Sequence, residues 1–193
     1  MLLTLLATAM LGISAAAAFV YAGGYDVAAT DPHWPVTYWI MEQTRINSIK
    51  ARAAGIIPPL GFDAPTNVAS AAGHFAAHCA MCHGAPGIDR GDFAAGMYPQ
   101  PPSLTDISKR YTPTQLFWIV KHGLKMSGMP SMADDGDDLL WATVGLLEKL
   151  PGMTPGAFKE LVEASNMQGM NMGGDPTPPA DAHDDHSAGP GPH

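Results

Sequence analysis

The chain has 193 residues, which is enough for one domain with additional segments and too short for two large domains. Ten Lys and Arg against 18 Asp and Glu leave a formal net charge of −8, which argues against a nucleic-acid-binding protein, because such proteins need clustered basic residues. Charged residues are only 15% of the chain, a low share for a freely soluble protein. The low charge therefore points to an apolar segment within the chain.

The first segment, residues 1–23, is that apolar segment. Residues 2–22 contain no charged side chain, and about twenty apolar residues are enough to cross the hydrocarbon core of a bilayer as a helix. A cleaved signal peptide is the alternative, because the run Ala15 to Ala18 offers small-residue cleavage sites. The length of the run favours a retained transmembrane anchor, and so do the aromatic residues that follow it, Tyr25, Trp34, Tyr38 and Trp39. With either interpretation, we expect the rest of the chain to be exported.

The second segment, residues 24–65, is expected to form a juxtamembrane helix and a linker. Pro35 suits the first turn of a helix that runs to about Ala54 with an imperfect apolar stripe. This helix is expected to lie against the bilayer or the following domain, and a docking surface for a membrane subunit is the alternative. The sequence Ile-Ile-Pro-Pro-Leu-Gly at positions 56–61 breaks any helix and predicts a linker.

The third segment, residues 66–152, contains the motif on which the functional interpretation depends. A helix beginning near Asn67 is expected to carry Cys79 and Cys82, the only two cysteines of the chain, with His83 next in sequence. Cys-x-x-Cys-His is the attachment pattern for a c-type haem. Two thiols at this spacing can each add to one vinyl group of a porphyrin, and the histidine can then ligate the iron. The Gly- and Pro-rich loop that continues to Ser103 is expected to wrap the haem edge.

A thioredoxin-like redox pair and half of a zinc site are two other uses of a cysteine pair at this spacing. A thioredoxin-like redox pair would need a surrounding βαβ pattern, and a zinc site would need a second pair of ligands at suitable spacing. The sequence offers neither of them. We therefore expect one covalently bound haem c.

Two further helices are expected in this segment. Thr112 as N-cap, Pro113 at the first helical position and Gln115 form a capping-box pattern, and Gly123 is a typical helix stop. The last helix is expected to begin near Asp137 or Asp138, whose carboxylates can cap it, and to end before the proline at position 151.

The second axial ligand of the iron is open among several residues. Four methionines compete, namely Met97, Met126, Met129 and Met132, although a methionine more often fills a gap in a core than binds a metal. Histidine ligation is less favoured. His74 and His78 are too close to His83, on the same expected helix, to reach the opposite face of the haem, and His122 suits a helix end.

Residues from about 67 to 150 resemble a small bacterial class I cytochrome c domain. The matching features are Phe75 four positions before the motif, Cys-x-x-Cys-His-Gly at 79–84, Gly128-Met129-Pro130 after a helix ended by glycine, and Trp141 in the last helix. The stretch from Tyr25 to Trp34 also resembles membrane-anchored members of this group. A departure is Leu146, where many relatives have an aromatic residue. The resemblance implies that Met129 is the distal iron ligand opposite His83.

The predicted fold is therefore all-α: a small class I cytochrome c haem domain with an N-terminal transmembrane helix and a disordered C-terminal tail. A haem ligated by His and Met is six-coordinate, so it suits one-electron transfer and not an enzymatic reaction. We expect an electron carrier on the periplasmic side of the bacterial inner membrane, with redox proteins as donor and acceptor and a dehydrogenase or respiratory oxidase complex as its setting. A haem sensor or enzyme with a labile distal ligand is the alternative.

The fourth segment, residues 153–193, is expected to form a short helix to about Ala164 and a flexible tail rich in Met and His. The tail contains too little apolar sequence to fold alone. Its thioether and imidazole groups could bind copper, which makes a copper-handling protein a third functional alternative. A solvated tail without a ligand is favoured. The residues concerned are Met167, Met170, Met172, His183, His186 and His193.

Overall fold

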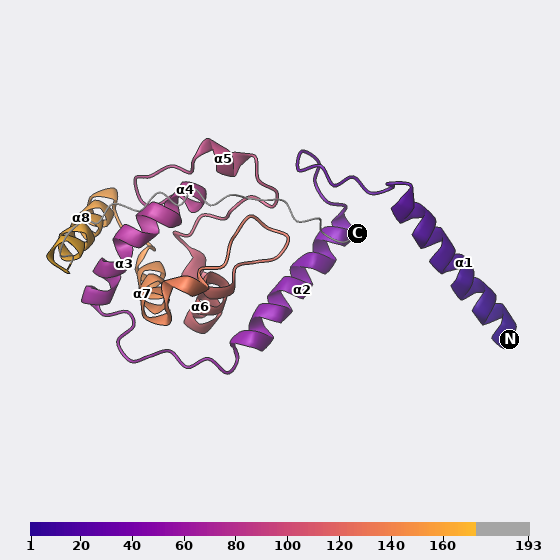
Figure 1. The fold of residues 1–193 in the computed structure, drawn as a ribbon, viewed down its shortest axis with the longest axis horizontal. Helices are drawn as coiled ribbons and strands as arrows, with labels where there is room; N and C mark the ends of the chain where they lie inside the picture. The colour runs from indigo at the N-terminus through magenta and orange to yellow at the C-terminus, as the bar shows by residue number, and fades with distance from the viewer. Residues whose placement is uncertain (173–193) are drawn as a thin grey trace, which may run out of the picture.

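The computed structural model describes the backbone of residues 1–172 and the side chains of residues 1–167. The regular elements in this range are helices, with one isolated β-bridge between Ala85 and Ile88 (Figure 1). The all-α prediction is confirmed. In chain order the elements are α1 Leu2–Tyr21, α2 Pro35–Ala53, α3 Pro65–His78, α4 Ala80–His83, α5 Asp92–Ala95, the 3-10 helix η1 Ile107–Lys109, α6 Pro113–His122, the 3-10 helix η2 Ala133–Asp135, α7 Asp137–Lys149 and α8 Pro155–Met172.

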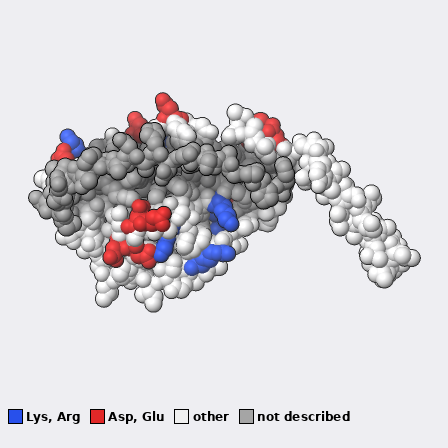
Figure 2. Space-filling view, viewed as in Figure 1, with Lys and Arg blue, Asp and Glu red and all other residues white. Residues whose placement is uncertain are grey.

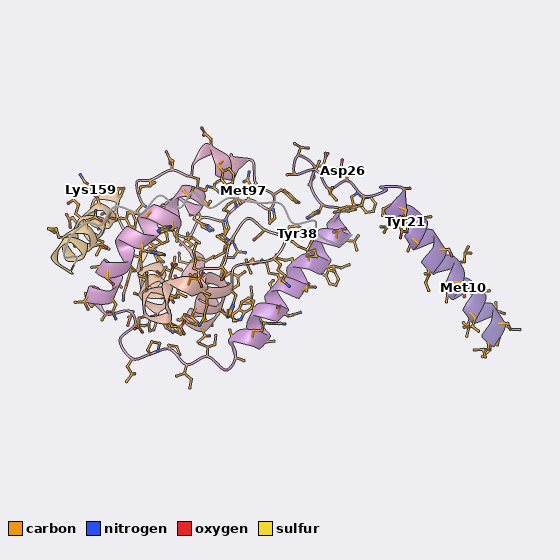
Figure 3. All side chains as sticks on the ribbon, viewed as in Figure 1. Met10, Tyr21, Asp26, Tyr38, Met97 and Lys159 are labelled. Atoms are coloured by element: carbon orange, nitrogen blue, oxygen red, sulfur yellow. The ribbon has the colours of Figure 1, made fainter. Side chains whose placement is uncertain are left out.

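Helix α1 stands apart from the other helices. It extends away from them in Figure 1, and Figure 3 shows Met10 and Tyr21 on this helix, apart from the other helices. Near its end, the Phe19 ring lies 5.9 Å from that of Trp34, in the segment that follows. Its mean hydropathy is 2.0 and none of its residues is buried. By length and composition this helix fits either a membrane anchor or an export signal.

Helix α2 has two halves with different surroundings. In the second half, Ile49 and Ala53 are buried, and the Arg45 guanidinium donates a hydrogen bond to the Tyr111 hydroxyl at 2.7 Å. Pro35 occupies the first helical position, as predicted. The second half of α2 therefore packs on the domain that follows, alongside α6. The first half has an exposed apolar face formed by Val36, Trp39 and Ile40.

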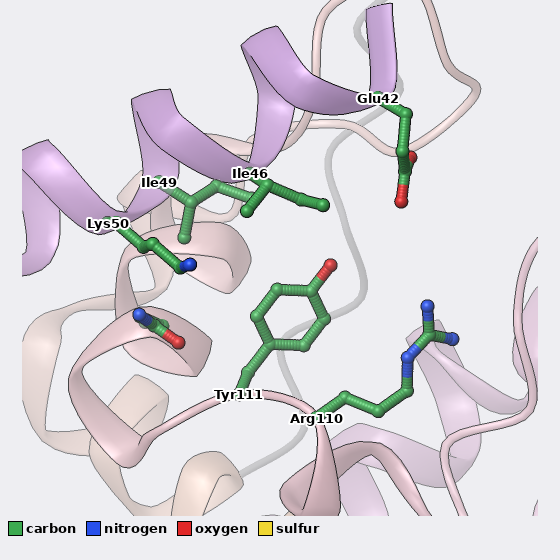
Figure 4. Close-up of a pocket in the computed structure, with 7 residues that line it drawn as sticks. Glu42, Ile46, Ile49, Lys50, Arg110 and Tyr111 are labelled. Carbon is green, nitrogen blue, oxygen red and sulfur yellow. The ribbon is translucent and has the colours of Figure 1, made fainter. Parts of the chain in front are cut away.

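A pocket of about 250 Å³ lies where α2 meets the segment that leads into α6 (Figure 4). Figure 4 shows Tyr111 and Arg110 facing Glu42, Ile46 and other side chains of α2 across this pocket. The lining mixes acidic, basic and apolar groups, and none of the predicted haem-site residues belongs to it. The pocket thus marks the seam between α2 and the domain.

The hydrophobic core lies among α3, α6, α7 and α8. Ala71 and Ala72 on α3 and Leu140 and Val144 on α7 have no exposed surface. Burying a branched apolar side chain contributes about 1.5–3 kcal/mol, whereas the small alanines let two helix backbones approach closely. Leu146, the departure from the family pattern, is also fully buried, so an aliphatic side chain fills this part of the core.

The start of α7 agrees with the sequence prediction, but its cap does not. The N-cap is Gly136, and no side chain makes a capping hydrogen bond there. The prediction that Asp137 or Asp138 caps the helix is wrong. The Asp137 carboxylate instead accepts a hydrogen bond from the Lys121 ammonium at 2.6 Å. Both aspartates lie in the first turn, where the helix dipole favours negative charge.

Helix α8 is longer and more closely packed than the sequence predicted. It continues to Met172, whereas the prediction ended it near residue 164. Phe158 is only 1% exposed and meets Phe75 of α3 edge-to-face, with ring centroids 6.0 Å apart. The division of the chain at residues 23, 65 and 152 stays a prediction, while core packing continues beyond residue 152. The first part of the predicted flexible tail, with Met167, Met170 and Met172, is therefore helical and belongs to α8, and the prediction is wrong there. The rest of the predicted tail lies outside the described residues.

Candidate haem site

The Cys-x-x-Cys-His motif lies at the junction of two helices. Helix α3 ends at His78, Cys79 links it to α4, and α4 carries Cys82 and His83. The prediction that one continuous helix carries the motif is therefore wrong. The Cys82 amide nevertheless donates to the Cys79 carbonyl at 3.1 Å, which keeps the two cysteines one turn apart. Both thiols are free and partly exposed. Two accessible thiols one turn apart suit attachment to a single porphyrin.

The His83 ring is held by a backbone carbonyl that the sequence did not identify. Its Nδ1 lies 2.7 Å from the Pro102 carbonyl oxygen, which can only accept a hydrogen bond, so Nδ1 carries the proton and Nε2 is free to bind a metal. Arg90 donates to the neighbouring Pro101 carbonyl at 2.7 Å. Burial lowers the pKa of His83, the Pro102 carbonyl opposes this and the Arg90 charge reinforces it. The histidine is thus held as the neutral imidazole that iron ligation requires.

The Cys79 thiol does not resemble the reactive thiol of a dithiol redox centre. Burial, followed by the negative charge of Asp135 and by Cys82, raises its pKa to about 11. Reactive cysteines in redox motifs have lowered pKa values because the thiolate is the nucleophile. This environment therefore disfavours the thioredoxin-like alternative. The part of the chain that the structure describes contains no group of three or more His, Cys, Asp or Glu placed to hold a metal ion.

The loop that carries Met129 folds back onto the end of α6. The Leu124 amide donates to the Met129 carbonyl at 3.2 Å, and the Met129 amide donates to the Ser127 hydroxyl at 3.2 Å. Gly123, which ends α6 as predicted, has φ of +63°, and a Cβ on it would lie 2.6 Å from Pro130 backbone atoms and 2.7 Å from the Met129 carbonyl oxygen. Only glycine lets the loop approach the helix end so closely.

The four candidate methionines have different surroundings. Met126 is 75% exposed and has φ of +58°, whereas Met129 and Met132 are partly buried against the core. Met97 packs on the loop itself, because a Cβ on Gly128 would lie 1.6 Å from the Met97 methyl carbon. The exposure of Met126 therefore disfavours it as the distal ligand, whereas burial does not distinguish Met129 from Met132. The assignment of Met129 as the distal ligand stays a prediction.

The other histidines make contacts of their own. His74 and His78 lie on α3 with ring centroids 4.6 Å apart, and His74 Nε2 is 3.3 Å from the Asp135 carboxylate. They are on a different helix from His83, contrary to prediction, although still close to it in sequence. His122 ends α6, as expected, and its ring lies 5.1 Å from that of Trp118.

Charges of both signs share the visible face of the domain (Figure 2). Lys121 pairs with Asp137 at 2.6 Å, and Lys109 pairs with Asp106 at 2.5 Å. Because a carboxylate pairs with each of these two lysines, they do not form a simple positive rim around the site.

One comparison with known proteins found a match in the region that contains this site. A family model described as cytochrome c oxidase, cbb3-type, subunit III, matches residues 66–145, a little under half of the chain. Residues 66–145 form a class I cytochrome c domain. No curated protein and no solved structure matches the chain. The match includes the cysteine motif, and a cytochrome c domain implies haem-based electron transfer.

The cytochrome c domain packs Trp141 between aromatic rings of two other segments. Trp141 of α7 stacks face-to-face on Phe117 of α6, with centroids 4.2 Å apart, and meets Phe62 edge-on at 5.4 Å. Trp141 thus joins α6 and the segment before α3 to α7, the last helix of the matched region. The methionine loop rests on the C-terminal end of the same helix, α6.

Proposed function

We propose that the protein is a one-electron carrier whose single haem c is attached through Cys79 and Cys82 and ligated by His83 and Met129. The observation that carries this proposal is the 2.7 Å contact between His83 Nδ1 and the Pro102 carbonyl, beside two free thiols one turn apart. This donor set suits an iron porphyrin, because a neutral imidazole and a thioether are the axial ligands of electron-transfer cytochromes c. When bound, the haem supplies a reversible one-electron couple.

The protein side chains keep the proposed site closed to substrates. His83 and Met129 would occupy both axial positions, so neither a substrate nor a small gas has free access to the metal. The partly buried position of Met129, together with the hydrogen bonds that tie its loop to α6, supports a ligand that stays in place. We therefore propose an electron-transfer protein and not an enzyme.

We further propose that residues 1–23 remain as a membrane anchor and that the haem domain faces the bacterial periplasm. Support comes from the exposed apolar surface of α1, followed by the exposed aromatic side chains Trp34 and Trp39. Trp and Tyr prefer the membrane–water interface. The intact mass of protein purified from membranes tests this proposal. A mass that lacks residues 1–23 would instead identify a signal peptide.

Redox proteins are the proposed donor and acceptor. The matching family is described as a subunit of a cbb3-type cytochrome c oxidase, so we propose a respiratory complex as the setting of this carrier. Purification from membranes with partners retained tests this proposal, followed by identification of the subunits that accompany the haem-staining band. Recovery of the cytochrome alone under mild conditions would speak against it.

The ligand assignment is tested by comparing Met129→Ala with Met132→Ala. Both methionines are partly buried against the core, so the two variants lose similar packing. We expect the near-infrared Met–Fe(III) band in the wild type and in Met132→Ala, and its loss in Met129→Ala with haem still attached. Retention of the band in Met129→Ala would refute the assignment. Binding of carbon monoxide by the reduced wild type would favour the sensor or enzyme alternative.

A further inference from the structure

The segment between α1 and α2 is fastened to the loop that precedes Pro102. The His33 amide donates to the Tyr98 hydroxyl at 3.0 Å, across 65 positions of sequence. The two rings meet edge-on with centroids 4.9 Å apart, and His33 Nδ1 lies 2.7 Å from the Tyr25 hydroxyl. Tyr25, His33 and Tyr98 are all partly buried. We call these three residues the buckle.

The loop held by the buckle contacts both sides of the proposed haem site. One position before Tyr98, the Met97 methyl packs on Gly128, the residue that precedes Met129. Four positions after Tyr98, the Pro102 carbonyl accepts the hydrogen bond of His83. Figure 3 shows Met97 within the domain, on the segment between α5 and α6. Residues 97–102 therefore form one short connection between the surroundings of the two proposed axial ligands.

We propose that Tyr98 is a positioning residue for the Met129 loop and that the segment joining α1 to α2 is a functional part of the haem crevice. Tyr98 acts through Met97. While the His33 amide holds the Tyr98 hydroxyl, Met97 stays on Gly128 and the Met129 loop stays closed. Without this hydrogen bond, Met97 can move away and the loop opens more often. This inference rests on the proposed His83 and Met129 ligation.

A ligand-exchange measurement distinguishes this role from a purely structural one. Imidazole binds a ferric cytochrome c only when the distal methionine has left the iron, so its apparent affinity reports how often the loop opens. Loss of a single hydrogen bond in Tyr98→Phe should tighten imidazole binding about two- to tenfold. It should also lower the temperature at which the near-infrared Met–Fe(III) band disappears. A residue that served only global stability would shift the unfolding midpoint and leave imidazole binding unchanged.

The matched control is Tyr111→Phe in the full-length protein. It also removes a hydroxyl that joins the N-terminal region to the domain, in this case the hydrogen-bond partner of Arg45, but it leaves the Tyr98 hydroxyl and its His33 partner unaltered. We expect wild-type imidazole affinity in this variant. Equal effects of Tyr98→Phe and Tyr111→Phe would overturn the inference, as would a Tyr98→Phe protein with unchanged imidazole binding.

A second pair of variants keeps the inference testable if Tyr98→Phe yields no holoprotein. Met97→Ala should tighten imidazole binding, because it removes the group that packs on Gly128, and Met97→Leu should restore most of the wild-type behaviour. Unchanged binding in Met97→Ala would overturn the inference while leaving the axial ligands as proposed. A wild-type protein that lacks the Met–Fe(III) band would instead overturn the proposed ligation together with this inference.

Discussion

Substituting Gly123 with alanine should loosen the proposed iron ligation by displacing the backbone on either side of the Met129–Pro130 bond. Gly123 has φ of +63° and ψ of −169°, a region that residues with a side chain almost never occupy, at a cost of about 1–3 kcal/mol. The added Cβ would lie 2.6–2.7 Å from backbone atoms of Met129 and Pro130. Backbone atoms cannot rotate out of the way as a side chain can, so the loop itself must move.

Gly136→Ala is the control that separates backbone strain at a positive φ from the clash of the added Cβ with the loop. Gly136 also has a positive φ, +83° with ψ of 146°, but a Cβ on it would meet nothing within 4 Å. Gly136→Ala should therefore lower the free energy of unfolding by about 1–3 kcal/mol through backbone strain alone. Gly123→Ala should lower it by a further amount of about 1–3 kcal/mol, which is typical of overpacking at a site that cannot relax freely.

Two measurements on the holoprotein check this prediction. Denaturant titrations give the free energies of unfolding, and the near-infrared Met–Fe(III) band reports the ligand. The band should weaken or disappear in Gly123→Ala and stay intact in Gly136→Ala. Equal free energies of unfolding in the two variants, with the band unchanged in both, would refute the argument that Gly123 exists to seat the loop.

Two further predictions concern α8 and His74. Phe158→Ala should lower the free energy of unfolding by about 3–5 kcal/mol, because the buried ring packs on Phe75. A decrease below about 1 kcal/mol in a denaturant titration would show that α8 does not stabilise the core. Burial lowers the pKa of His74 below its ordinary 6.5. The Asp135 carboxylate opposes this shift, and His78 adds to it. The folded protein therefore takes up this proton less readily than the unfolded chain, and stability should fall as the pH drops below about 6.5. The stability of His74→Gln should decline less steeply with falling pH than that of the wild type. Equal pH dependence in the two proteins would contradict the lowered pKa of His74.

Local signals in the sequence were sufficient for several elements. The capping box of α6 forms as predicted. The Gln115 backbone amide donates to the Thr112 hydroxyl, and the Gln115 side-chain oxygen accepts from the Thr112 backbone amide. The α2 start at Pro35 and the α6 stop at Gly123 also agree with prediction. Each of these signals involves residues within four positions of one another, so the backbone geometry of a single turn decides the outcome.

Predictions failed or fell short where two distant parts of the chain compete for one group. The Asp137 carboxylate could cap α7 or pair with Lys121, sixteen positions away, and only the packing of α6 beside α7 brings the lysine within reach. Helix α8 was predicted to end near Ala164, before a stretch of Met, Asn and Gly residues, but it continues to Met172. Its Phe158 finds a partner in Phe75 of α3, which no local pattern indicates.

The sequence alone predicted the chemistry of attachment, because two cysteines one helical turn apart and an adjacent histidine match the attachment pattern for a c-type haem. The tertiary structure decided what holds that chemistry in place. The Pro102 carbonyl reaches His83 across nineteen positions, and the His33 amide reaches Tyr98 across sixty-five. Backbone groups are present in every residue and carry no sequence signature, so only the folded chain shows which of them will meet.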